Sequence, residues 1–297
     1  MNYNQNGIAL ILVLWVTMLL TVIAGSFVFS MRTDTTLALN ARSTAQAEAY
    51  ADAGIQRGVY ELFKPASDRT SWKNNKAYYR WRYGDASYID IRLTDLSGRI
   101  DINRAPYTIL HKLIAGTGLD EEETNILVNR IRDWLDTDDQ KRENGAEFED
   151  YLAQGLSYGP ANGPFQVLDE LELVLGMTPQ LYARLKSSLT VNSHESGINP
   201  KLASRQVLMA IPGITAEIVD DYILLRDEAL KNNRPIPELK EAARILARYS
   251  GVVYSVRATA VMNNGAIFIR DAVVEIVHGK QDRVVFHTWK EGDAPTS

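Results

Sequence analysis

The 297-residue chain contains no cysteine and only four histidines. The lack of cysteine excludes disulfides, thiolate metal sites, cysteine nucleophiles and a lipid-modified cysteine anchor. The histidines are scattered, and none belongs to an HExxH zinc pair; they are His111, His194, His278 and His287. A phosphate-binding glycine loop is also absent. We therefore expect a protein that is not an enzyme.

Charge is missing from the start of the chain. The run from Ile8 to Phe29 contains no charged residue and no proline. A helix of about 20 apolar residues spans the hydrocarbon core of a membrane, so we expect residues 8–31 to form a transmembrane segment. The helical pattern continues to about Phe63 and should end at Pro65. An apolar stripe suited to packing against a sheet or another helix is predicted at Ala41, Ala45, Ala49, Ile55, Val59 and Leu62.

Three interpretations of this N-terminal segment are open. The first is an uncleaved anchor, the second is a secretory signal peptide cut near Ala24 to Ser26, and the third is a prepilin-type segment cut after Gly7. The absence of Lys and Arg before the run, and the helical pattern that continues through Ser26, argue against a secretory signal. A glycine directly before the run favours the prepilin interpretation, in which residues 1–7 are a leader and Ile8 begins the mature chain. The leader carries no basic residue, so charge does not set the orientation of the helix.

Beyond the helix, the apolar pattern changes twice. Alternation of apolar and polar residues predicts strands in residues 79–93 and 99–102, and again in residues 252–262, 266–277 and 283–290. Between these two groups the apolar period is helical. The order predicts an α+β fold, with a long N-terminal helix packed on an antiparallel sheet and a large all-α domain inserted into that sheet. The expected segments are a pilin-like helix with first strands (32–102), the inserted domain (103–249), the remaining strands (250–290) and a tail (291–297).

The helical block contains a weak internal repeat. Asp101 to Asp133 and Gly197 to Asp227 share an Ile-Asn start, an apolar Ile/Val-Leu pair and an Arg-Asp end. In the second copy, Ile211 to Thr215 resembles the turn of a helix-hairpin-helix DNA-binding module. That module grips phosphate through backbone N–H groups at a helix start. Here acidic residues occupy the helix starts, and the formal net charge of −5 also disfavours phosphate binding, so structural helical hairpins are favoured.

Carboxylates crowd the segment between residues 133 and 150. Lys141 and Arg142 alone offset them. Such a segment is either a solvated acidic loop or an oxygen-rich site for a hard cation such as calcium, and its spacing is not that of an EF-hand. Both interpretations stay open on the residues alone. The candidate ligands are Asp133, Asp136, Asp138, Asp139, Glu147 and Asp150.

The parts taken together resemble a known family. The segments that carry the resemblance are Gly7 to Val16, Ala47 to Gly54, Asp101 to Asn103, Asp133 to Asp139, Gly145 to Glu147, and Pro160 to Pro164. Together they look like the protein K family of type II secretion minor pseudopilins, over nearly the whole chain. The N-terminal pattern alone would indicate only a pilin-like protein.

The resemblance implies more than the residues do. It implies cleavage after Gly7 by prepilin peptidase, N-methylation of Ile8, calcium in the helical domain and a tip complex with minor pseudopilins I and J. Most pilin-like subunits have Glu at the fifth mature position, whereas this chain has Leu12. The expected function is to cap a periplasmic pseudopilus and help to start its assembly, for protein export across the outer membrane. The chain would be a single-pass inner-membrane protein with its bulk in the periplasm.

An alternative of another class is a membrane-anchored helix-hairpin-helix protein that binds DNA during uptake.

Overall fold

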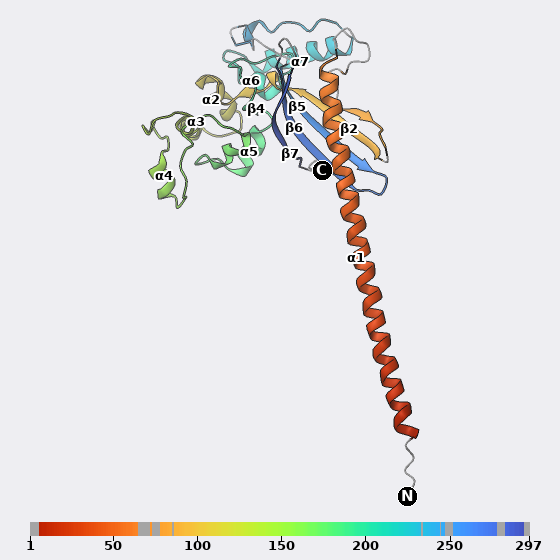
Figure 1. Cartoon of the computed structure of the whole chain (residues 1–297). Helices are drawn as coiled ribbons and strands as arrows, with labels where there is room; N and C mark the ends of the chain where they lie inside the picture. Colours follow the sequence, from red (N-terminus) through yellow and green to blue (C-terminus); the bar gives the residue numbers. More distant parts are fainter. Residues whose placement is uncertain are drawn as a thin grey trace.

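The computed structural model consists of a long helix, a five-stranded antiparallel sheet packed on the C-terminal part of that helix, and a helical insert beside the sheet (Figure 1). It describes residues 6–64, 72, 78–84, 86–232, 234–243, 245–246, 252–277 and 283–293. The arrangement confirms the predicted α+β fold with a helical insert. Several predictions lie outside the described residues: the leader up to residue 5, the helix end at Pro65, the turn at Asp85, the boundary at Tyr249, His278 and the tail beyond residue 293.

The sheet has the strand order β1-β2-β5-β6-β7. Its strands are β1 (Tyr79–Trp81), β2 (Ala86–Asp95), β5 (Val253–Met262), β6 (Ile267–Val277) and β7 (Arg283–Glu291). All neighbouring strands are antiparallel. The alternation that predicted the second strand is confirmed, because Ile89, Ile91 and Leu93 are at most 2% exposed. Gly265, with φ of 87°, makes the predicted turn between β5 and β6.

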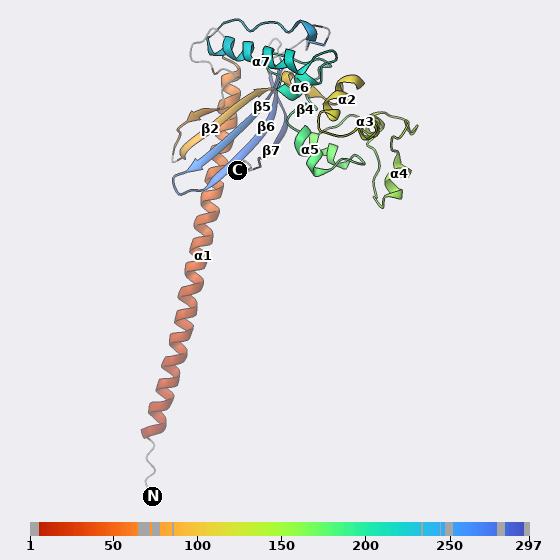
Figure 2. The same cartoon turned by 180° about the vertical axis from the view of Figure 1, so that it is seen from behind.

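Helix α1 (Asn6–Leu62) covers one face of this sheet with its C-terminal part only (Figure 2). The buried residues recur every four positions, at Ala47, Ala51, Ile55 and Val59. Ile55 and Val59 lie on this buried face as predicted, whereas Ala41, Ala45 and Ala49 are exposed and do not meet the sheet; their packing against another helix stays a prediction. Alanines occupy several faces of this segment, so composition alone does not identify the face that meets the sheet.

Two glycines identify that face. A Cβ at Gly54 would lie 2.8 Å from Cβ of Ala258 and 2.8 Å from Cγ2 of Ile89. At Gly58 it would lie 2.8 Å from Cγ1 of Val256. Real Cβ atoms do not approach other carbons so closely, so the contact between helix and sheet requires glycine at both positions.

A buried arginine fixes the rotation of the helix on the sheet. Arg270 on β6 is 8% exposed and donates to Asp52 at 2.7 Å and to Glu48 at 2.5 Å. Both carboxylates lie on α1, one turn apart. Since a buried guanidinium is stable only when it is paired, this pairing favours one rotational setting of α1.

The insert connects β2 to β5 and has a hydrophobic core of its own. Its elements are η1 (Leu96–Gly98), β3 (Ile100–Asp101), α2 (Tyr107–Ala115), α3 (Glu121–Leu135), α4 (Phe148–Ala153), η2 (Leu168–Leu173), α5 (Pro179–Leu185), β4 (Leu189–Thr190), α6 (Arg205–Met209), α7 (Ala216–Lys231) and η3 (Lys240–Ala242). The strand expected at residues 99–102 is present as β3. It pairs in parallel with β4 and not with the main sheet, and Ile100 and Ile102 belong to the core of the insert.

The glycine contacts make a stability prediction. Gly→Ala normally stabilises a helix by roughly 0.5–1 kcal/mol. We expect Gly54→Ala instead to destabilise the fold by about 1–3 kcal/mol, because the added methyl group overpacks the interface with β2 and β5. Chemical denaturation of the full chain in detergent, followed by circular dichroism, measures this difference.

The matched control is Gly25→Ala in the same helix. Nothing lies within 4 Å of a Cβ at Gly25, so this change should leave the denaturation midpoint unchanged or raised. Equal midpoints for the two variants would show that the close approach at Gly54 does not limit packing.

Candidate metal centre

The acidic segment is the loop that joins α3 to α4 in the insert. Asp133 lies in the last turn of α3 and is fully buried. Its Oδ1 accepts from the Arg142 guanidinium at 2.8 Å, and its Oδ2 accepts from the Ala146 N–H at 2.9 Å. A Cβ at Gly145 would lie 1.8 Å from that Oδ2, so only glycine lets the loop close around the carboxylate. Asp133 therefore organises the loop through hydrogen bonds.

Glu147 is the unsatisfied group of this loop. It is 8% exposed, and neither of its carboxylate oxygens has a hydrogen-bond partner among the described residues. Burial, followed by the charges of Asp133, Asp136 and other loop aspartates, raises the pKa of the Glu147 carboxyl to about 7. A buried carboxylate without a partner is unfavourable unless a cation neutralises it.

Two further buried oxygens without partners occur in the same region. They are Oδ1 of Asp136, at the C-terminal cap of α3, and Oδ1 of Asn162, in the loop after α4. Asn162 has a left-handed backbone, with φ of 49°, and its amide Nδ2 donates to Asp139 at 3.1 Å. Calcium binds carboxylate and amide oxygens of this kind. Oδ2 of Asp136 accepts from the Arg142 guanidinium, so the oxygens left to bind a hard cation are Oδ1 of Asp136, the Glu147 carboxylate and Oδ1 of Asn162.

The carboxylates of the other predicted ligands already accept hydrogen bonds within the loop. Asp138 accepts from the Gln140 N–H at 2.9 Å, and Asp139 accepts from Asn162. Asp150 accepts from Lys141 Nζ at 2.8 Å and from the Glu147 N–H at 2.9 Å. These contacts fold the loop. Sequence reasoning missed Asn162 as a candidate, although it lies in one of the segments that carried the family resemblance.

The apolar part of α1 is exposed. Its large apolar side chains from Leu10 to Leu39 lie away from the rest of the chain, and none of its most apolar segment is buried. Among the described residues, α1 is the one helix long and apolar enough to cross a membrane. Gly7 and Ile8 lie in its first turn, since α1 begins at Asn6. Cleavage between these two residues stays a prediction.

The two predicted helical hairpins exist, and acidic groups surround the starts of their second helices. Asp120 caps α3 and is followed by Glu121 to Glu123. In the second hairpin, Arg205 near the start of α6 forms a two-point ion pair with Asp220 on α7, at 2.6 and 2.9 Å. An arginine held by a carboxylate on the neighbouring helix is a poor ligand for a phosphate backbone.

A serine in a Gly-x-Ser-x-Gly pattern also occurs, at Ser157 between Gly155 and Gly159. A nucleophile elbow requires a strand before this pattern and a helix after it. Here the pattern follows the short helix α4 and continues into irregular chain. It therefore does not form a nucleophile elbow.

Comparisons with known proteins agree with this architecture. The family described as type II secretion system (T2SS), protein K matches residues 92–194. A type II secretion system protein K from Pseudomonas aeruginosa is 28% identical over 74% of this chain and 73% of that protein. Its counterpart from Klebsiella pneumoniae is 29% identical over 71% of each. The chain is thus similar to type II secretion system protein K, over residues 92–194 by the family model and over about 70% of its length by these relatives. The names of both relatives describe a component of a secretion system.

The fold of this chain matches a solved structure. A chain in the crystal structure of the GspK-GspI-GspJ complex from the enterotoxigenic Escherichia coli type 2 secretion system has a TM-score of 0.62. At 15% identity, the match covers 89% of this chain and 99% of that one. The likeness supports the whole architecture of helix, sheet and insert.

Proposed function

We propose that this chain is a minor pseudopilin that caps the tip of a periplasmic pseudopilus and helps to start its assembly. The observation that carries the proposal is the shape of the molecule, in which an exposed apolar helix points away from a wide two-part head (Figure 1). The exposed part of α1 anchors the chain in the inner membrane and packs with the helices of neighbouring subunits in the pseudopilus.

Leu12 favours a terminal place in the filament. It is the fifth residue after the proposed cleavage site, where most pilin-like subunits have Glu, and its side chain is 62% exposed. A glutamate in lipid is unfavourable unless it is paired, for example with the N-terminal amine of an adjacent subunit. A subunit with no neighbour above it has no such amine to pair with, and leucine avoids an unpaired charge.

The position of the insert also favours the tip. It leaves the sheet where β2 ends at Asp95, which pairs with Tyr254 on β5. Gly54 of α1 faces Ile89 on β2, and Gly58, further along α1, faces Leu93, so β2 runs toward the end of α1 far from the membrane. A bulky unit at that end obstructs the addition of another subunit above it, whereas at the tip it meets no obstacle.

The partners follow from the solved relative, which lies in a complex named for GspK, GspI and GspJ. We infer that this chain likewise associates with minor pseudopilins I and J, and that prepilin peptidase processes it first. We also propose calcium as the ion of the α3–α4 loop, with Asp136, Glu147 and Asn162 among its ligands. The unpartnered oxygens of these residues support that assignment. DNA binding gains no support from the acidic starts of the hairpin helices.

The proposed calcium site predicts that substitution of Glu147 weakens the stabilisation of the chain by calcium. Glu147→Gln should remove most of the increase in thermal midpoint that calcium gives to the detergent-solubilised chain, because a ligand charge is lost. Without calcium, the variant should be at least as stable as the wild type above pH 7, since the buried carboxylate is then ionised and unpaired. The matched control is Glu149→Gln, an exposed neighbour, which should respond to calcium like the wild type. An unchanged response of Glu147→Gln to calcium would remove Glu147 from the site.

The capping role predicts an assembly defect without the insert. The paired ends of β2 and β5 allow residues 96–251 to be replaced by a short turn. We expect the shortened protein to reach the membrane but to support several-fold fewer pseudopili and less secretion, because the tip surface is missing. Electron microscopy and a secretion assay measure these effects against the full-length protein at equal expression. Normal filament number and length would contradict a capping role.

Cleavage after Gly7 would set the start of the mature chain. We expect the native protein to begin at Ile8 with a methylated amine, as determined by N-terminal sequencing and intact mass. Gly7→Leu should block cleavage, whereas Asn6→Ala should not. A native chain beginning beyond Ser26 would have lost the membrane segment, and the assembly role with it.

A further inference from the structure

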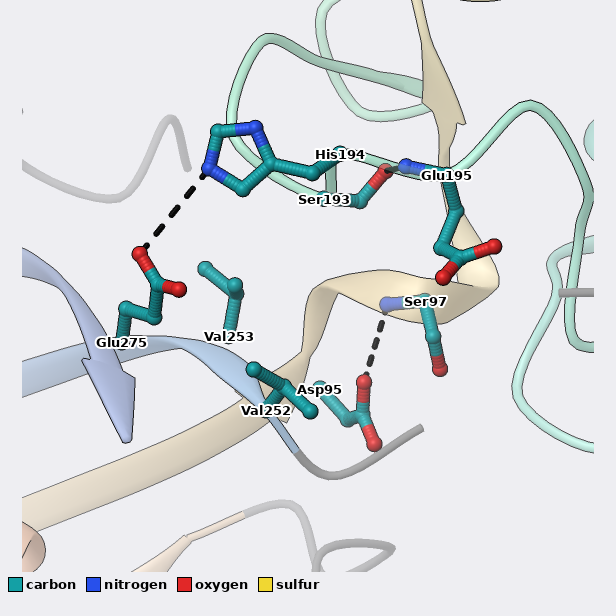
Figure 3. A pocket seen from close by; sticks show the side chains of 8 residues that line it. All are labelled: Asp95, Ser97, Ser193, His194, Glu195, Val252, Val253 and Glu275. Atoms are coloured by element: carbon teal, nitrogen blue, oxygen red, sulfur yellow. Dashed lines mark hydrogen bonds and ion pairs between the residues drawn. The ribbon is translucent and has the colours of Figure 1, made fainter. Parts of the chain in front are cut away.

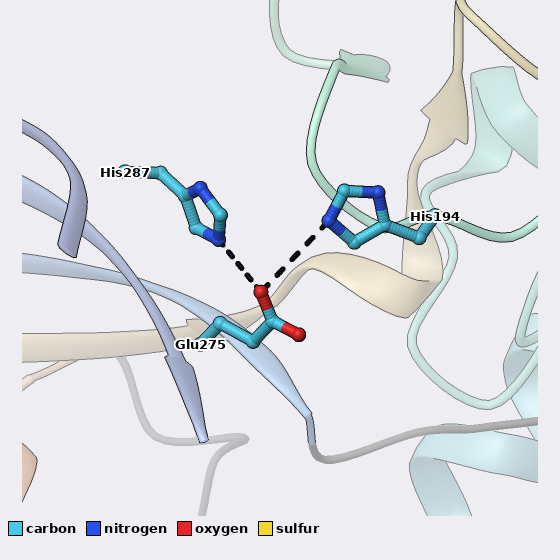
Figure 4. Close-up of side chains that lie close together, drawn as sticks. All are labelled: His194, Glu275 and His287. Atoms are coloured by element: carbon cyan, nitrogen blue, oxygen red, sulfur yellow. Dashed lines mark hydrogen bonds and ion pairs between the residues drawn. The ribbon is translucent and has the colours of Figure 1, made fainter. Parts of the chain in front are cut away.

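Two histidines and a glutamate meet where the insert contacts the sheet. Nε2 of His287 lies 2.8 Å from Oε2 of Glu275, and Nε2 of His194 lies 3.9 Å from the same oxygen (Figure 4). The ligand atoms of all three side chains lie within 4.8 Å of one another. They come from two units of the fold, because His194 belongs to the insert while Glu275 and His287 lie on β6 and β7. This group is separate from the acidic α3–α4 loop.

The chemistry of this group is that of a zinc site. Imidazole nitrogen and carboxylate oxygen are zinc ligands at about 2.0–2.2 Å, and a tetrahedral centre places its donor atoms roughly 3.3 Å apart. The observed separations of 2.8 and 3.9 Å lie on either side of that value. Small side-chain rotations would therefore bring the three donors around one ion. Three protein ligands with an open fourth position also match the ligand count of zinc sites that hold a water.

The backbone is irregular at both histidines, and at His287 the irregularity is a β-bulge. The β6–β7 register changes between the pairs Val273–Thr288 and Val274–Phe286, so His287 is the extra residue of a β-bulge. Bulges re-aim side chains and are frequent beside functional sites.

His194 has a left-handed backbone, with φ of 56°, which is uncommon for a residue other than glycine. The buried Asp101 holds this loop, because its Oδ2 accepts from the His194 N–H at 2.8 Å and from Ser193 Oγ at 3.2 Å. Asp101 thereby acts as a positioning residue for His194.

Space for a fourth ligand is available. A cavity of about 300 Å³ adjoins His194 and Glu275, between the loop at residues 193–195 and the start of β5 (Figure 3). The His194 side chain is 50% exposed, so an ion can enter from solvent.

We propose that His194, Glu275 and His287 bind one zinc ion, with water as the fourth ligand, and that the ion fastens the insert to the last two strands of the sheet. This proposal does not depend on the role at the pseudopilus tip. Zinc in this position would connect the insert directly to β6 and β7.

The test uses the full chain in detergent, freed of metals and then saturated with calcium so that the acidic loop does not compete. Zinc is titrated against a chromophoric chelator. We expect one zinc per chain, and at least about tenfold weaker binding for His194→Gln and for His287→Gln. The matched control is His111→Gln, since His111 lies away from the site beside Asn125 and should leave zinc affinity unchanged.

A second measurement uses only the wild-type chain, so it does not depend on whether the variants fold. Cobalt(II) replaces zinc in the wild-type chain, and its visible absorption should show tetrahedral coordination with nitrogen and oxygen ligands. Zinc affinity equal to wild type in both histidine variants would overturn the proposal. So would a wild-type chain that binds zinc no tighter than about 1 mM, or an octahedral cobalt spectrum. Those results would mean that the two imidazoles only share the Glu275 carboxylate through hydrogen bonds.

Discussion

The close contact of α1 with the sheet is the constraint on which the remaining architecture depends. Gly54 and Gly58 let the helix backbone approach the side chains of β2 and β5, and Arg270 pairs with Glu48 and Asp52 to fix the rotation of the helix. This contact uses only the C-terminal part of α1. Among the described residues, the N-terminal part consequently has no packing partner, and its apolar side chains need lipid or other helices to cover them. The proposed membrane insertion and filament packing would both use this exposed surface.

The insert is tolerated because it leaves the sheet between two strands that pair directly. Asp95 and Tyr254 are register partners, so the sheet is continuous across the point where the chain departs. The insert buries a separate core, and its short β3–β4 pair ties the beginning of the insert to a segment almost 90 residues later in the sequence. The sheet packs on α1, while the loops of the insert lie outside that contact.

The alternation and helical periodicity of apolar residues predicted the fold well. Features that depend on contacts between residues far apart in the sequence could not be predicted in this way. Strand alternation placed Ile89, Ile91 and Leu93 in the core because one face of an antiparallel sheet is covered. Ala41, Ala45 and Ala49 do not face the sheet, because alanines occur on several faces of α1 and do not identify the one that meets it. Within the acidic segment, composition could not separate Asp133, which hydrogen-bonds the loop, from Glu147, which has no partner. The meeting of His194 with Glu275 and His287 depends on strand order and a bulge, and neither leaves a local sequence signal.

A rigid relation between the two units matters if both contribute to one partner surface. One ion pair between them, Lys290 with Asp169, is exposed at both ends, and such pairs contribute only about 0–1 kcal/mol. The covalent connections at Asp95 and Val252 constrain distance more than angle. The loop at Ser193 and His194 is different, since the buried Asp101 holds it on one side and it faces Glu275 on the other. Any interaction that strengthens this point restricts how far the insert can rotate about its two connections. The contact of this loop with β6 and β7 is therefore one place where the orientation of the insert on the sheet can be fixed.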